Sequence, residues 1–456
     1  MTTRLNIARE VAYDAFSQVM EHQKNPDAAV EYLLQKRHGS ITKRDRRLIK
    51  EILFGSLRWY SKIYWILQKT SSRDLNSTTP EIRASLILGT YQIFYMDNIP
   101  DRAAVNESVE YIRFKGQTHA VSFVNGILRS IARKAEYFAK PDKDKQPAEY
   151  LALQYAHPQW IVDRWLRRFS FDRMKELLLS NNAPPPFAIR VNVCKVPREE
   201  IQEFRDELLR SEKIHSEKPA LRSCLLLTPT PPLDAESLFG RGYYTIQGEA
   251  SQLIASLVDP QPDTCIVDAC CGPAGKLSHL YEEVGGKATL IGIEPNPVQI
   301  RRATETLSRL GHEGVTLLEQ DFLTYTPSHP IDKILIDAPC SGLGVLRKHP
   351  EGKWQKKPEI INRMAAVQRQ LLQHGFSLLQ AGGELIYSVC SFEYEETIAQ
   401  LAWMLDEYAG KIELVSPVQR LPDYYKRFVT RENLLLIYSG NKNNMDGFGA
   451  FIVRKL

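Results

Sequence analysis

The chain has 456 residues, of which 43% are hydrophobic and 25% charged, a composition typical of a soluble globular protein too long for one ordinary core. No apolar run approaches the roughly 20 residues that span a bilayer, and the N-terminal residues have no apolar signal-peptide core. Seven cysteines, an odd number, do not fit a disulfide framework and favour a reducing, cytoplasmic environment.

The net charge of +5 is concentrated in the N-terminal part of the chain. Residues 1–140 have 22 Lys and Arg against 14 Asp and Glu, a net charge of +8, whereas the remainder has 37 against 40. The densest basic cluster contains Lys43, Arg44, Arg46, Arg47 and Lys50. Such a cluster suits a phosphate backbone, but a solvated helix face has the same composition, so charge alone leaves both interpretations open.

The first part of the chain predicts a helical bundle. Apolar residues recur at helical spacing in six stretches, Ala8–Met20, Ala28–Leu34, Leu48–Trp59, Ile82–Met96, Ala104–Phe114 and Val121–Ala132. Thr42 precedes a charged first turn and is expected to cap the third helix. Pro100 is expected to separate the fourth helix from the fifth.

A linker and a small α+β region follow the bundle. Residues 139–150 are rich in charge and proline without an apolar period, which favours a linker. His157 begins a predicted helix that runs to about Leu179, and the prolines at 184–186 end it. Three strands and one helix are predicted after it: strands at Ile189–Asn192, Leu225–Leu227 and Tyr243–Gln247, and the helix at Arg198–Leu209.

From Thr264 onward, strand and helix patterns alternate, which predicts a doubly wound α/β sheet. The predicted strands are Cys265–Asp268, Leu290–Glu294, Val315–Leu318, Ile334–Asp337 and Glu384–Val389, with a closing hairpin at Leu434–Tyr438 and Gly449–Arg454. The predicted organisation is therefore an all-α domain over 1–138, a linker over 139–150, a small α+β region over 151–247 and a Rossmann-like α/β domain over 248–456.

The turn after the first of these strands is the candidate cofactor site. It contains Cys270, Cys271, Gly272, Pro273, Ala274, Gly275 and Lys276. Small residues let a ligand approach the backbone, and the N-terminus of the next helix offers free N–H groups. Glu294 ends the second strand, where an acid can accept both hydroxyls of a ribose, and Asp321 follows the third strand, where it could reach an adenine. No G-x-G-x-x-G is present, so a nucleoside cofactor without a pyrophosphate fits better than a dinucleotide; a tight turn with solvated acids is the alternative.

Two cysteines are predicted just past the carboxyl ends of strands, the fourth and fifth of this sheet in chain order. Cys340 lies in Asp337-Ala338-Pro339-Cys340-Ser341-Gly342, and Cys390 follows Tyr387-Ser388-Val389. Ligands bind at this edge of an open α/β sheet, so the pair suggests nucleophilic chemistry, a disulfide or a metal site. No histidine or further cysteine completes a metal quartet at the usual spacing, so no metal is expected. Two buried structural cysteines remain the alternative.

These motifs resemble those of the RNA cytosine-C5 methyltransferases. The turn at 268–276 is similar to that family's Cys-Ala-Ala-Pro-Gly-Gly-Lys motif, and the two cysteine motifs are similar to its fourth and sixth motifs. Residues 347–354 resemble the segment after the fourth motif, and 446–448 its closing strand. In the N-terminal part, Ile99–Glu107 and Val124–Arg129 resemble the signature of the antitermination-factor-B helical RNA-binding fold.

The resemblance implies a fold, a cofactor and roles for individual residues. It implies that residues 270–276, Glu294, Asp321 and Asp337 bind S-adenosyl-L-methionine. A cysteine thiolate adds to C6 of cytosine so that C5 can take the methyl group; the resemblance assigns this attack to Cys390 and a role in release to Cys340. Asp337 would serve as the acid near N3. By analogy with DNA cytosine methyltransferases, Cys340 would attack instead.

The implied substrate is a cytidine of 16S ribosomal RNA in the small-subunit precursor. DNA and membrane are not expected partners, and a monomer is expected. Arg347 and Lys353 are expected to hold phosphates. The rivals are the same chemistry on transfer RNA and a non-catalytic RNA-binding or ribosome-assembly factor.

The chain departs from the family pattern at four positions. Cys271 and Gly272 stand where alanines are usual, and Gly248 where an aspartate is common. Ala274 replaces a glycine, which costs energy if that position requires a positive φ.

Overall fold

The computed structural model describes residues 6–37, 41–134, 140–217, 219–221, 223–231, 233–440 and 445–456. The chain forms two compact units: Met1–Pro184 with Leu346–Pro358, and Pro185–Val345 with Glu359–Leu456. The end of the predicted helical domain at 135–138, and residue 139 of the predicted linker, lie outside the described residues. The segment 346–358 therefore belongs to the first unit although its neighbours in sequence belong to the second.

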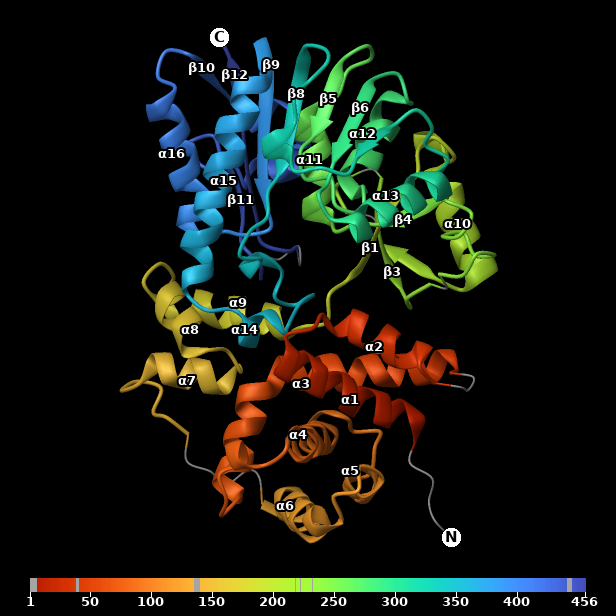
Figure 1. The fold of residues 1–456 in the computed structure, drawn as a ribbon, viewed down its shortest axis with the longest axis vertical. Coiled ribbons are helices and arrows are strands. Elements are labelled where there is room, and N and C mark those ends of the chain that lie inside the picture. The colour runs from red at the N-terminus through yellow and green to blue at the C-terminus, as the bar shows by residue number, and fades with distance from the viewer. Residues whose placement is uncertain are drawn as a thin grey trace. The chain divides into compact units, whose positions relative to one another are not determined.

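All six predicted N-terminal helices are confirmed (Figure 1). They are α1 (Ile7–His22), α2 (Pro26–Gln35), α3 (Lys43–Thr70), α4 (Pro80–Tyr95), α5 (Asp101–Phe114) and α6 (Val121–Lys134). Thr42 caps α3 as predicted, in a capping box in which its side chain and that of Asp45 satisfy each other's backbone N–H groups. Pro100 is the residue before α5, also as predicted.

The core of the helical unit requires a close approach of α3 and α4. Gly55 of α3 faces the ring of Tyr91 on α4, and a Cβ at Gly55 would lie 2.0 Å from that ring. The Tyr91 hydroxyl donates to Glu51 at 2.7 Å, so the phenol is buried with its polar end satisfied. Glycine is thus the residue that allows this aromatic ring to enter the bundle.

The segment from 147 to 182 forms three short helices: α7 (Pro147–Gln154), α8 (Gln159–Leu166) and α9 (Phe171–Asn182). The single helix predicted from His157 to Leu179 is wrong, because Ser170 is extended and its side chain caps α9 by accepting from the Arg173 N–H. Helix α7 begins within the segment predicted as a linker.

The second unit begins with a small antiparallel sheet in the order β2-β3-β1-β4. Its elements are β1 (Phe187–Val191), α10 (Ile201–Glu212), β2 (His215–Glu217), β3 (Cys224–Thr228) and β4 (Tyr244–Ile246). Strands β1, β3 and β4 and helix α10 were predicted, whereas the three-residue strand β2 was not, since it has no apolar pattern.

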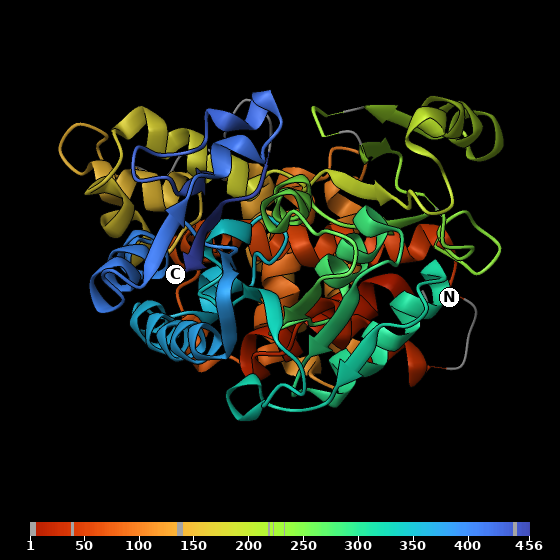
Figure 2. The ribbon, with the colours of Figure 1, turned by 90° about the horizontal axis from the view of Figure 1, so that it is seen from above.

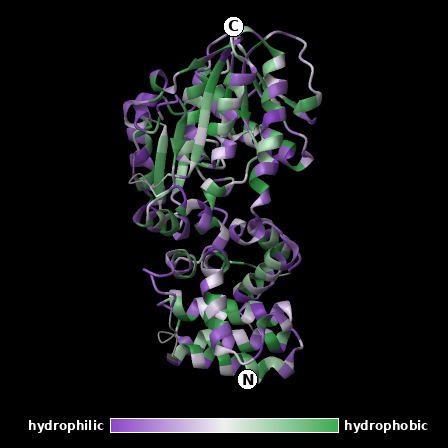
Figure 3. Ribbon diagram, turned by 90° about the vertical axis from the view of Figure 1, so that its left-hand side faces the viewer, coloured by the Kyte–Doolittle hydropathy of each residue, from purple (hydrophilic) through white to green (hydrophobic). Residues whose placement is uncertain are grey.

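The main sheet has the order β10-β12-β9-β8-β5-β6-β7, with β11 paired to β12. Its strands are β5 (Cys265–Asp268), β6 (Thr289–Ile293), β7 (Thr316–Leu318), β8 (Ile331–Asp337), β9 (Leu379–Val389), β10 (Ile412–Val415), β11 (Leu435–Ile437) and β12 (Phe448–Lys455). Figure 2 shows the last strand, marked C, among the blue strands, and Figure 3 shows that the strands are mostly hydrophobic. The five predicted strands and the closing hairpin are confirmed; the half-exposed edge strand β10 was not predicted.

Helices of this unit are α11 (Glu249–Val258), α12 (Gly275–Val284), α13 (Pro297–Leu310), α15 (Glu359–Leu378), α16 (Ile398–Glu407) and the short α17 (Asp423–Lys426). Strands β5, β6 and β7 run outward in one direction, and the chain then returns to place β8 on the other side of β5. The order of strands therefore reverses between β5 and β8, which is where open α/β sheets bind ligands.

Candidate functional site

The predicted cofactor turn connects the end of β5, one of the two strands at this reversal, to the start of α12. The backbone N–H of Cys271 donates to Ile293 at 3.0 Å, which ties the turn to the end of β6. Gly272 has φ +51°, and a Cβ added at Gly272 or Gly275 would meet no atom within 4 Å. Open space therefore lies beside both glycines, as a ligand that approaches the backbone requires.

Ala274 has a positive φ, the conformation in which alanine in place of glycine costs energy. Its φ is +63° and its ψ +27°, in the left-handed region, and it is fully buried at the start of α12. An L-residue in this region costs about 1–2 kcal/mol. The surrounding structure must therefore hold this turn in place.

Four carboxylates converge on this turn. The pKa of the Cys270 thiol is raised, first by burial and then by the negative charges of Asp268, Asp337, Glu294 and Asp321. The Cys271 pKa is also raised, chiefly by burial, so neither thiol resembles an activated nucleophile.

Each of these acids has a defined place. Glu294 accepts from the Gly272 N–H at 3.2 Å and from the Asn296 N–H at 2.9 Å, which links the end of β6 to the turn. Asp321 is exposed and accepts from the Leu323 N–H at 2.9 Å. Burial, and then the charge of Asp337, raises the pKa of Asp268 to about 7.

Asp337, at the end of β8, forms an ion pair with Lys276 at the start of α12. Its other oxygen accepts from the Ser388 hydroxyl of β9 at 2.7 Å. The carboxylate is thus oriented from both neighbouring elements, and Lys276 places a positive charge beside it.

The two predicted catalytic cysteines lie together. Their Sγ atoms are 3.0 Å apart, neither cysteine is in a disulfide, and both residues are half-buried. The pKa of Cys340 is raised well above its ordinary value, first by the hydrogen bond with Cys390 and then by burial. A protonated Cys340 can therefore donate to the sulfur of Cys390.

A buried glutamate holds the two cysteine loops together. Glu396 accepts from the backbone N–H of Ser341 at 2.7 Å and from the hydroxyls of Ser341 and Ser391 at 2.5 and 2.6 Å. Gln368 of α15 donates to Glu396 at 3.1 Å and to the Pro339 carbonyl at 2.9 Å. Each cysteine is therefore flanked by a serine bonded to the same carboxylate.

Glu396, Ser388 and Asp268 were not predicted as site residues. Ser388 lies in the quoted stretch before Cys390, and Glu396 follows Cys390 in the sequence, so their polar side chains beside an apolar strand were the available signal. Nothing in the spacing showed that Glu396 would reach back to the Cys340 loop.

Two basic residues of the segment that follows the Cys340 loop, Arg347 and Lys353, are buried. Lys353 is 1% exposed and Arg347 is 2% exposed. The Lys353 ammonium donates to the carbonyls of Arg58 and Ala156 at 2.9 and 3.0 Å and to Asn182 Oδ1 at 2.6 Å. The expectation that Lys353 holds a phosphate is wrong, because its ammonium is buried and bonded within the helical unit. Arg347 is buried as well, so its role in holding a phosphate stays a prediction.

The basic cluster at the start of α3 is exposed throughout. Arg46 pairs with Glu31 at 2.8 Å and Lys50 with Asp27 at 2.9 Å, both pairs in solvent. Such pairs contribute little, so their cations are available to another partner.

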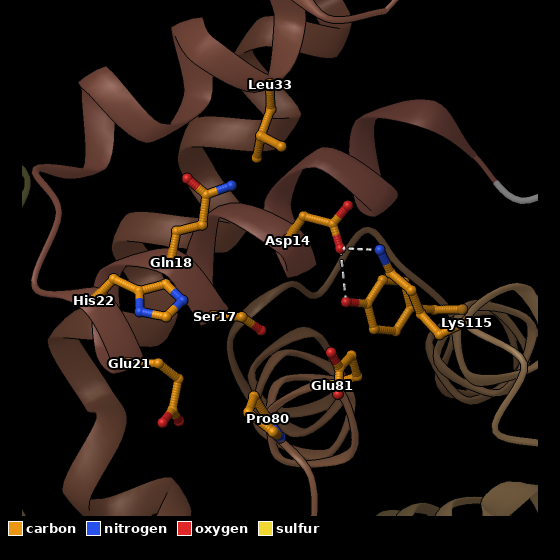
Figure 4. Close-up of a pocket in the computed structure, with 10 residues that line it drawn as sticks. Asp14, Ser17, Gln18, Glu21, His22, Leu33, Pro80, Glu81 and Lys115 are labelled. Atoms are coloured by element: carbon orange, nitrogen blue, oxygen red, sulfur yellow. Dashed lines mark hydrogen bonds and ion pairs between the residues drawn. The ribbon is translucent and has the colours of Figure 1, made fainter.

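The helical unit also has a surface cavity of about 450 Å³ (Figure 4). Its three carboxylates have partners: Asp14 binds Lys115 and Tyr111, Glu21 binds Arg83, and Glu81 accepts from Gln117. Its excess of acids does not suit a phosphate backbone.

The part of the chain that the structure describes contains neither a cluster of metal ligands nor a membrane-spanning helix. Among these residues, no group of three or more His, Cys, Asp or Glu side chains could hold a metal ion. No helix in the same ranges is long and apolar enough to cross a membrane.

Three family models match successive parts of the chain. Residues 6–133 match the NusB family, 157–233 match the ferredoxin-like domain of RsmF/B-like methyltransferases, and 255–452 match the 16S rRNA methyltransferase RsmB/F model. The predicted likeness of the N-terminal domain to antitermination factor B is confirmed.

Curated relatives cover nearly the whole chain. It is 28% identical over 455 residues to the probable ribosomal RNA small subunit methyltransferase B of Bacillus subtilis, with 98% of each chain covered. It is 32% identical over 401 residues to the protein of the same name from Coxiella burnetii, covering 84% of this chain and 90% of the relative. The crystal structure of PH0851 has the same fold, with a TM-score of 0.82, 22% identity and coverage of 99% of this chain and 100% of that one. The chain therefore belongs to the 16S rRNA methyltransferase RsmB/F family, a family of RNA methyltransferases that use S-adenosyl-L-methionine.

Proposed function

We propose that this protein methylates C5 of a cytidine in 16S ribosomal RNA through a covalent adduct between Cys390 and C6 of the base. The observation that carries the proposal is the pair of sulfur atoms 3.0 Å apart, at the ends of β8 and β9 and next to Asp337. The site brings together two thiols and a carboxylate, and we assign to them the nucleophile, the second thiol and the acid that this chemistry requires.

The cofactor is proposed to lie on the turn at 270–276. The open side of Gly272 and Gly275 leaves room for it, Glu294 suits a ribose, and Asp321 lies at the end of the next strand. The carboxylates around Cys270 complement the positive sulfonium. When bound, S-adenosyl-L-methionine supplies the methyl group as an electrophile.

The cysteines are proposed to have unequal roles. Cys340, with its raised pKa, remains a thiol and donates a hydrogen bond to the sulfur of Cys390, which stabilises a thiolate there. The Cys390 thiolate forms the C–S bond to C6, and the C5–C6 electron pair shifts toward N3, which accepts a proton through Asp337. When C5 takes the methyl group, N3 returns its proton to Asp337. A base then removes the C5 proton, the C5–C6 double bond forms again as the C–S bond breaks, and the Cys390 thiolate is regenerated. Cys340 lies where it can assist this release.

The target base must leave any stack to reach these thiols. The exposed basic face at the start of α3 is proposed to hold RNA phosphates. We also propose the domain boundaries predicted from the sequence: a helical domain over 1–138, a linker over 139–150, a small α+β region over 151–247 and a methyltransferase domain over 248–456.

The test compares Cys390→Ala and Cys340→Ala with the exposed control Cys194→Ala, using 16S ribosomal RNA and transfer RNA as substrates. Cys390→Ala should lose nearly all activity and form no adduct. Cys340→Ala should accumulate a protein–RNA adduct that survives a denaturing gel, and the control should match the wild type. On RNA containing 5-fluorocytidine, wild type and Cys340→Ala should both be trapped, because fluorine at C5 cannot leave as a proton.

Three results would contradict the proposal. An adduct in Cys390→Ala would reverse the roles of the thiols. Full activity in both variants would make the cysteines structural. Bisulfite sequencing that maps the new methyl group to transfer RNA alone would assign the other substrate.

A further inference from the structure

A fully buried arginine from the small sheet contacts the cofactor turn. Arg190, on β1, is 0% exposed. A guanidinium has five N–H donors, and all five are used here. Nε and Nη2 bind the two oxygens of Glu282 at 2.8 and 2.7 Å, Nη2 also donates to Ser278 Oγ at 2.9 Å, and Nη1 donates to Gln247 Oε1 and to the Gly275 carbonyl.

Three of these acceptors belong to α12. Gly275 is its first residue, Ser278 lies one turn later, and Glu282 one turn beyond that. The acceptors of the guanidinium therefore extend over two turns of the helix, and its bidentate pair with Glu282 sets its orientation. The bond to the Gly275 carbonyl is 2.7 Å long and acts directly after Ala274.

Ala274 is the residue that needs such support. It holds a left-handed conformation without the freedom of glycine, and such conformations persist only when neighbouring groups hold them. The following N–H groups, which begin α12, take their direction from this turn.

We infer that Arg190 is a positioning residue that holds the Ala274–Gly275 turn in the conformation that receives S-adenosyl-L-methionine. The small α+β region thereby contributes to cofactor binding. This inference rests on the proposed location of the cofactor at that turn.

The test uses Arg190→Lys in the full-length protein, since lysine keeps the charge but cannot reproduce the planar five-donor fork. The matched control is Arg309→Lys. Arg309 of α13 also binds the small α+β region, because it donates to the carbonyls of Phe239 and Tyr244 at 2.6 and 3.0 Å, but it does not contact the turn at Ala274 and Gly275. Calorimetry measures the Kd for S-adenosyl-L-methionine well below the melting temperature of each variant, and steady-state kinetics give separate KM values for cofactor and RNA.

Arg190→Lys should raise the cofactor Kd and KM by about tenfold or more, equivalent to about 1.4 kcal/mol, with the RNA KM unchanged. The control should stay within about threefold. Adding Ala274→Gly to Arg190→Lys should restore much of the affinity, because glycine adopts the turn without support. If Arg190→Lys fails to fold, Glu282→Gln weakens the same clamp and should give a smaller increase in the same direction.

Two failures can be told apart with Glu294→Ala. If Glu294→Ala leaves the Kd unchanged, the proposed cofactor location is wrong. If Glu294→Ala weakens binding while Arg190→Lys does not, or if Arg190→Lys lowers only the active fraction and Ala274→Gly restores nothing, Arg190 is merely structural.

Discussion

Substitution of Lys353 by methionine tests whether the segment 346–358 is a structural element or an RNA contact. Methionine has a similar length and volume but no donor. The ammonium is buried, its three donors are used by three neutral oxygens, and burial lowers the Lys353 pKa well below its ordinary value. The side chain therefore joins α3, the loop before α8 and the end of α9.

The magnitude follows from the acceptors that are left behind. The Arg58 carbonyl lies inside α3 and has the helix as an alternative partner, so the loss is borne mainly by the Ala156 carbonyl and Asn182. A buried unsatisfied acceptor costs about 1–3 kcal/mol, and removal of a buried ammonium offsets part of this. The expected destabilisation is about 2–4 kcal/mol.

The assay is thermal or urea unfolding of Lys353→Met, with RNA affinity measured against salt concentration at a temperature where the variant is folded. The control is Lys357→Met, an exposed lysine of the same segment. Lys353→Met should unfold at lower temperature with an unchanged salt slope, and Lys357→Met should have wild-type stability. Wild-type stability of Lys353→Met together with a shallower salt slope would contradict this structural role and would support a phosphate contact by Lys353.

Two further predictions concern charge. Because the folded pKa of Asp268 is about 7, above its ordinary value of 3.8, the folded state binds the extra proton between these pH values, and stability falls as pH rises through this window. Asp268→Asn should remove this dependence, so its melting temperature relative to wild type should increase from pH 4 to pH 8; a constant difference would contradict the pKa. The double substitution Arg44→Gln with Arg47→Gln should reduce the salt slope of RNA binding by about 1.4 if each arginine contacts a phosphate of single-stranded RNA. An unchanged slope would show that the basic face at the start of α3 is exposed to solvent but does not contact RNA phosphates.

Much of the fold could be predicted because its signals are local. Helical spacing of apolar residues, the Thr42 cap and Pro100 each act within a few residues, and the corresponding helices formed where predicted. The strands of the main sheet are short apolar runs between turns, and their burial needs no knowledge of their neighbours. The break at Ser170 was missed because a single capping serine competes with an otherwise continuous helical pattern.

The order of the domains, the strand ends that bear acids and thiols, and the family could all be predicted, since each depends on residue type and spacing along the chain. Which of these residues contact one another depends on how the elements pack. Cys340 and Cys390 are 50 positions apart and become neighbours because β8 and β9 pair in parallel. Arg190 reaches Gly275 across 85 positions, and Lys353 lies buried in the helical unit, although charged residues are most often exposed. Burial and long-range hydrogen bonds depend on how elements pack, and no local pattern encodes which distant acceptor will satisfy a buried cation.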